Sequence, residues 1–116
     1  MAFTATLVYE LHPQTEPDAA KLFRAELVGR RWQDRYQGDR MPAHSLWIHR
    51  SAEPQHTTDD VHAACAEDVL RAVAAVAAMG KKIALLRAWV QVTGAGSFGL
   101  IPIPGLAPPA SPLVPT

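Results

Sequence analysis

Apolar residues recur with two different periods along the first 93 residues, and the order of these periods constrains the fold more than any other feature of the sequence. A period of two indicates a β-strand with one buried face, whereas a period near 3.6 indicates an amphipathic helix. The order along the chain is strand, helix, strand, strand, helix, strand. The predicted strands span residues 3–11, 30–37, 45–50 and 83–92, and the predicted helices span residues 16–28 and 58–79.

Residues at the ends of the two predicted helices have the chemistry of helix caps. Thr57 precedes a stretch with acidic residues in its first turn, and Gly80 follows its last apolar position. Side-chain oxygens at an N-cap and glycine after the last turn stabilise helix ends. By the same reasoning, Thr15 is the predicted N-cap of the first helix and Gly29 its stop.

This element order predicts a single α+β domain over residues 1–93. Short connections and right-handed crossovers favour a four-stranded antiparallel sheet with both helices on one face, the ferredoxin-like βαββαβ arrangement. The expected order of strands across the sheet is last, first, third, second. Residues 94–116 hold four glycines, six of the ten prolines and no charged residue. They predict a Gly/Pro-rich C-terminal arm or tail, either docked or free.

Two helices cover only one face of such a sheet, so the other face is open. The alternation assigns these residues to the open face: Val8, Trp47, His49, Ile83, Leu85, Arg87 and Trp89. The register of the 30–37 strand decides whether Trp32 and Tyr36, or Arg31, Gln33 and Arg35, join them. Exposed apolar patches of this kind mark interfaces. We therefore expect a homodimer, formed through sheet faces or sheet edges.

Residues 29–50 concentrate the side chains that bind polyanions. They hold five of the eleven Lys and Arg residues and two of the three tryptophans. Arginines contact phosphates and aromatic rings stack on bases, although the interleaved Asp34 and Asp39 offer the arginines a partner within the chain. The candidate binding surface comprises Arg31, Trp32, Arg35, Tyr36, Trp47, His49, Arg50 and Trp89.

The predicted element order resembles that of the small dimeric CRISPR-associated nucleases and of antitoxins with ferredoxin-like folds. The resemblance implies a role in nucleic-acid binding or processing. Those nucleases carry an acidic residue at the end of the first strand, where Glu10 stands in this chain with His12 beyond it. His44 and His49 are the acid–base candidates if the protein is an enzyme. The third strand, SLWIHR, lacks the aromatic motif of RNA-recognition domains.

Other short motifs fail on their context. Gly94 to Gly99 matches G-x-G-x-x-G, but Pro102 and Pro104 prevent the helix that a dinucleotide site needs. A serine-hydrolase elbow at Ser97 needs a later histidine, and none follows His62. Metal ligation by His62 and Cys65 is disfavoured because Cys65 lies on the apolar stripe of its helix. We predict no metal, no cofactor and no catalytic residue.

Composition limits the possible functions and locations of the protein. The net charge is zero, so no global field attracts a polyanion. A lone cysteine favours a reducing compartment, and neither a basic leader nor a long apolar run is present. We expect a small cytoplasmic homodimer without membrane contact, acting as a non-catalytic binding or interaction module. The alternative is a nucleic-acid-binding or nucleic-acid-processing protein that uses the arginine-rich hairpin of residues 30–50; whether it is an enzyme stays open. A third possibility, a small-ligand pocket between the helices and the sheet, has no distinguishing feature in the sequence.

Overall fold

The computed structural model describes residues 2–94, which form two helices and five strands. The elements are β1 (Ala2–Leu11), α1 (Pro17–Gly29), β2 (Arg35–Tyr36), β3 (Asp39–Arg40), β4 (Ser45–Ser51), α2 (Thr58–Ala78) and β5 (Leu85–Thr93). The predicted C-terminal arm or tail lies outside the described residues, apart from its first residue.

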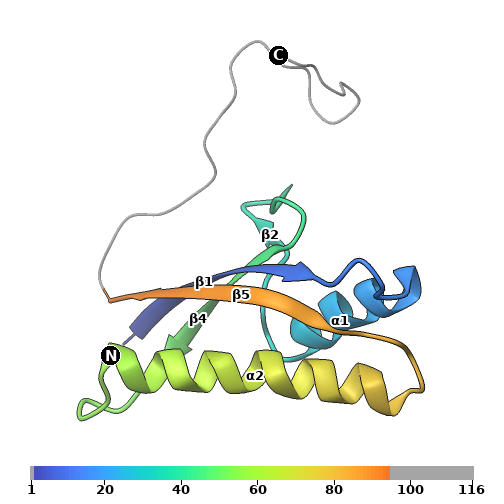
Figure 1. The fold of residues 1–116 in the computed structure, drawn as a ribbon. Coiled ribbons are helices and arrows are strands. Elements are labelled where there is room, and N and C mark those ends of the chain that lie inside the picture. The colour runs from blue at the N-terminus through green and yellow to red at the C-terminus, as the bar shows by residue number, and fades with distance from the viewer. Residues whose placement is uncertain (1, 95–116) are drawn as a thin grey trace.

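The main sheet has three antiparallel strands, with β1 between β4 and β5. Leu7 at its centre lies opposite Leu46 of β4 and Val90 of β5. Both helices lie against one face of this sheet, and the other face carries no helix (Figure 1). The α+β class is confirmed, and these three strands are neighbours in the expected order. The four-stranded ferredoxin-like arrangement is not confirmed.

The predicted 30–37 strand is where the fold departs from that arrangement. Only Gln33 pairs with the sheet, through a bridge to Trp47 in which the two backbones exchange hydrogen bonds of 2.6 and 3.1 Å. Trp32, one residue earlier, points to the helix side and is 1% exposed. After Gln33 the chain leaves the sheet, so the prediction of a full edge strand is wrong.

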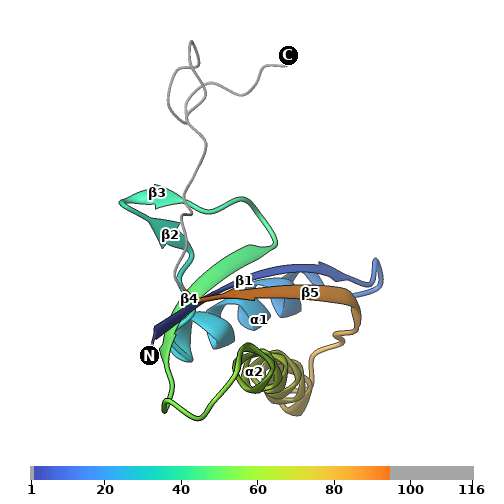
Figure 2. The same cartoon turned by 90° about the vertical axis from the view of Figure 1, so that its left-hand side faces the viewer.

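A hairpin takes the place of the missing strand. β2 and β3 pair across a turn formed by Gln37 and Gly38, whose φ angles are 50° and 88°. Two positive φ values in a two-residue loop match the twist of an antiparallel hairpin. The hairpin stands on the side of the sheet away from the helices (Figure 2). The hairpin therefore projects from the sheet beside the open face.

The core lies between the sheet and the two helices. Its buried side chains come from alternate positions of β1 and β4 and from one stripe of each helix, as the two periods of the sequence require. Trp32 is the largest fully buried side chain. The core comprises Phe3, Ala5, Leu7, Tyr9, Ala19, Phe23, Leu27, Trp32, Leu46, Ile48, Val61, Cys65, Val69, Ala72 and Val76.

The β1–β5 register changes between Glu10 and Leu11, and this change corrects two predicted positions. Because of the shift, Leu85 lies opposite Leu11, and both pack against the core. Ile83, which precedes β5, also packs against the core. The assignment of Ile83 and Leu85 to the open face was therefore wrong.

The ends of α2 follow the sequence signals. The Thr57 hydroxyl accepts a hydrogen bond from the Asp60 N–H, and the Asp60 carboxylate accepts one from the Thr57 N–H, at 3.3 and 2.8 Å. Gly80 follows the helix with a φ of 81°. The predicted cap of α1 is wrong. Thr15 instead exchanges hydrogen bonds with the backbone of Ala84, just before β5.

The C-terminus of α1 is closed by a left-handed residue that is not glycine. Gly29 is still helical, and the positive φ of 79° falls on Arg31. The N–H groups of Arg31 and Trp32 return to the carbonyls of Val28 and Leu27 at 3.0 and 3.1 Å. This pattern of two bonds around a left-handed residue is a common helix C-cap, and it turns Trp32 back onto the helix it has just left.

We predict that Arg31→Gly stabilises the fold by about 0.5–1 kcal/mol, because glycine adopts a positive φ without the Cβ clash of arginine. The matched control is Arg30→Gly, where φ is −95° and the side chain pairs with Glu26; this variant should be destabilised. Urea denaturation measures both. A stability loss in Arg31→Gly equal to that in Arg30→Gly contradicts the left-handed cap.

Candidate functional site

The open face of the sheet carries mixed polar, aromatic and aliphatic side chains. They alternate with the core positions along each strand, since successive side chains of a strand point to opposite faces. The face is made of Thr4, Thr6 and Val8 from β1, Trp47 and His49 from β4, and Arg87, Trp89 and Gln91 from β5. The predicted placement of Val8, Trp47, His49, Arg87 and Trp89 on this face is confirmed.

A row of aromatic side chains joins the hairpin to this face. The Tyr36 ring meets Trp47 edge-on with centroids 5.6 Å apart, and Trp47 meets His49 edge-on at 5.0 Å. The Trp47 indole N–H donates to the Arg35 carbonyl at 2.7 Å. His49 Nδ1 lies 2.9 Å from the hydroxyl of Thr4 on the neighbouring strand. The two contacts of Trp47 with Tyr36 and Arg35 hold the hairpin against β4, and the contact of His49 with Thr4 joins β4 to β1.

The exposed apolar part of the face lies on the β1–β5 side. Trp89 is 57% exposed and Val8 is 46% exposed, and the two residues are directly opposite each other in the β1–β5 ladder. Next to them, Arg87 Nε lies 3.1 Å from a carboxylate oxygen of Glu10. The result is an aromatic and aliphatic patch bordered by a charge pair that is neutral as a whole.

The predicted candidate binding surface is divided between different environments. Tyr36, Trp47, His49 and Trp89 lie on or beside the open face. Trp32 lies in the core on the other side of the sheet. Arg31 caps α1, Arg35 donates to the Gly38 carbonyl within the hairpin at 3.0 Å, and Arg50 faces α2. The register of this segment follows neither predicted alternative as a set, since Trp32 turns into the core at the Gln33 bridge while Tyr36 reaches Trp47 of the open face.

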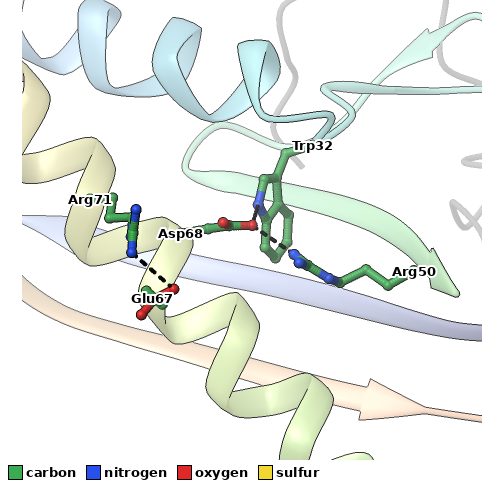
Figure 3. Close-up of polar contacts among 5 residues, drawn as sticks. All are labelled: Trp32, Arg50, Glu67, Asp68 and Arg71. Atoms are coloured by element: carbon green, nitrogen blue, oxygen red, sulfur yellow. Dashed lines mark hydrogen bonds and ion pairs between the residues drawn. The ribbon is translucent and has the colours of Figure 1, made fainter. Parts of the chain in front are cut away.

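Asp68 of α2 connects two of these predicted residues. One carboxylate oxygen accepts a hydrogen bond from the Trp32 indole N–H at 3.1 Å and lies 2.7 Å from Arg50 Nη1 (Figure 3). The Asp68 and Arg50 side chains are 18% and 28% exposed. A charge-assisted contact in this semi-buried setting is stronger than a surface pair. Trp32 and Arg50 therefore have a structural role in this fold.

Cys65 lies one turn before Asp68 and is fully buried. Burial raises the pKa of its thiol, while the nearby Arg50 opposes this shift and Asp68 adds to it. A buried thiol with a raised pKa is a poor nucleophile and a poor metal ligand. Residues 2–94 contain no group of three or more His, Cys, Asp or Glu side chains placed to hold a metal ion.

The residues considered for acid–base chemistry have different partners. His49 contacts Thr4 and Glu10 pairs with Arg87, both on the open face. His44 has a φ of 64° and its ring lies 5.5 Å from that of Tyr9, beyond the end of the hairpin.

The helix residues Lys21, Arg24 and Asp68 were missed by sequence reasoning, since charged residues on an amphipathic helix look like an ordinary solvated face.

Neither of the two helices in the described chain has an apolar stretch of the length needed to cross a membrane. Comparison with family models, curated proteins and solved structures finds no match to this chain.

We predict that Asp68→Ala lowers the free energy of unfolding by about 2–3 kcal/mol, because it leaves the Trp32 indole N–H and the Arg50 guanidinium without their shared acceptor. The adjacent Glu67→Ala is the matched control. Glu67 pairs with Arg71 at 3.4 Å, but both side chains are more than 60% exposed (Figure 3). Its loss should change stability by less than about 0.5 kcal/mol. Equal losses in the two variants contradict the structural role of Asp68.

Proposed function

We propose that this protein is a non-catalytic binding module that works as a homodimer, in which two copies meet through the open faces of their sheets. The observation that carries the proposal is the patch formed by Trp89 and Val8, which are 57% and 46% exposed on a face that the helices do not cover. Tryptophan is enriched at interfaces and dominates their binding energy.

Charge balance favours a second copy as the occupant of this face. The chain has equal numbers of basic and acidic residues, so two copies do not repel each other. The charge pair of Glu10 and Arg87 is already formed on the face, and a two-fold axis places the same neutral patch on both sides. Two sheets packed face to face bring such patches about 10 Å apart, with interdigitated side chains.

We also propose a cytoplasmic location. The support is the single cysteine of the chain, which is buried as a free thiol. An unpaired structural thiol is typical of proteins from a reducing compartment.

We predict that Trp89→Glu weakens self-association by at least about thirtyfold, the effect of losing a tryptophan worth about 2 kcal/mol at an interface. Leu70→Glu is the matched control, because Leu70 is 63% exposed but lies on α2, away from the open face. Sedimentation velocity over a concentration series measures both, and circular dichroism checks folding. A wild-type monomer at high micromolar concentration, or a Trp89→Glu protein that dimerises normally, contradicts the proposal.

A second candidate function is binding of single-stranded nucleic acid along residues 31–36, which lead from the end of α1 into the hairpin. The observation that favours it is the pair of exposed arginines, Arg31 and Arg35, neither of which forms an ion pair with another residue of the described chain. Arg35 precedes Tyr36, whose ring contacts Trp47. Cationic side chains beside aromatic rings are the usual components of single-strand binding surfaces.

For this candidate we predict salt-dependent binding of single-stranded RNA or DNA, with the affinity reduced in both Arg31→Ala and Arg35→Ala. Fluorescence anisotropy with a labelled oligonucleotide measures the affinity, and Arg71→Ala on α2 is the control. The absence of binding at low salt excludes this function.

A further inference from the structure

A cavity of about 410 Å³ lies between α1, the end of β1 and the chain that leads from the hairpin into β4. Its volume is within the range of small-molecule sites. It is separate from the patch of Trp89 and Val8. Its polar and ionisable lining residues are Tyr9, Lys21, Arg24, Asp34, Arg40 and His44.

The charges around this cavity are unbalanced, although those of the whole chain are balanced. Lys21, Arg24 and Arg40 contribute three positive charges, and Asp34 contributes one negative charge. Of the eleven Lys and Arg residues, all of which lie within the described chain, five form ion pairs: Arg30, Arg50, Arg71, Lys81 and Arg87. Three of the other six line this one cavity.

Rigid elements position these side chains. Lys21 and Arg24 are three residues apart on α1, which places them on the same side of the helix. Arg40 comes from β3, at the end of the hairpin. The backbone carbonyl of His44 accepts the Tyr9 N–H at 3.0 Å, which ties the chain entering β4 to β1. The cations therefore reach the cavity from two different sides.

The floor of the cavity is polar and fixed. Tyr9 is 4% exposed, and its ring packs edge-on against Phe23 with centroids 5.0 Å apart. Arg24 Nη1 lies 3.4 Å from the Tyr9 hydroxyl oxygen, which accepts this contact. No described residue accepts the hydroxyl hydrogen of Tyr9, so the hydroxyl keeps a donor for a ligand.

We propose that this cavity binds a small molecule through a phosphate group. Three cations and one carboxylate leave a net charge of two, which matches a phosphate monoester that is close to a dianion at neutral pH. Arginine donates paired hydrogen bonds to phosphate oxygens, and Lys21 adds a point charge. The Tyr9 hydroxyl supplies a neutral donor from below. Asp34 repels the phosphate and lowers the affinity of the cavity for it.

The test uses phenyl phosphate as the probe, titrated into the full-length protein at constant ionic strength and followed by amide chemical shifts. We expect saturable shifts at Ala20, Ala43 and His44, which line the cavity. Arg24→Gln and Arg40→Gln should each weaken binding about tenfold, the effect of losing about 1.4 kcal/mol from a charged hydrogen bond. Arg71→Gln on α2 is the control and should bind as the wild type does.

Asp34→Asn separates a binding defect from a folding defect, because it should strengthen the binding of phenyl phosphate. Shifts that do not saturate, or that respond equally to Arg24→Gln and Arg71→Gln, overturn the proposal. Binding of single-stranded RNA that depends on Arg40, without saturable binding of phenyl phosphate, also overturns it and assigns the cations to a nucleic-acid surface.

Discussion

The hydrogen bond from the Trp32 indole to Asp68 is the interaction on which the rest of this fold depends. A tryptophan buried to 1% exposure brings an N–H group into the core, and that group needs an acceptor. Asp68 supplies it from α2, and Arg50 of β4 compensates the charge of the carboxylate. A partly buried carboxylate without such a cation is costly. One carboxylate oxygen thus joins the end of α1, the middle of α2 and the end of β4.

This anchor explains why the sheet has three strands and a hairpin. The left-handed Arg31 turns Trp32 beneath the sheet, and only Gln33 is then in position to pair with β4. The chain beyond Gln33 rises on the other side as the hairpin, where Tyr36 packs against Trp47. The same departure carries Arg40 and His44 to the cavity above Tyr9. Both the hairpin beside the open face and the cationic cavity follow from where Trp32 is held.

Much of this fold was predictable from local patterns. The alternation in β1, the capping box at Thr57 and the glycine after α2 each report on a single element, and each was right. The 30–37 segment was misleading because its alternation has period two. That period indicates an extended chain, but it does not show whether the chain pairs with a neighbouring strand along its whole length. Gly29 was the wrong residue for the helix stop, because it is still helical and the left-handed position falls on Arg31.

The parts of the candidate site that could not be predicted depend on contacts between residues far apart in the sequence. Nothing local indicates that Asp68 meets Trp32 and Arg50, or that Lys21 and Arg24 of α1 face the same cavity as Arg40. The register change at Glu10 and Leu11 likewise has no signal in either strand alone, and it decides which side Leu85 takes. Composition and periodicity predict which face of a helix or strand a residue lies on. They do not predict which distant residue it contacts.

Hydrogen exchange of the Trp32 indole N–H, followed by NMR, tests the central claim most directly. If Asp68 holds this group in the core, its exchange requires global or near-global unfolding and is slowed by orders of magnitude relative to a free indole. The protection should disappear in Asp68→Ala and persist in Glu67→Ala. An indole of Trp32 that exchanges in the wild-type protein as fast as a free indole contradicts the anchor, and with it the explanation of the three-stranded sheet.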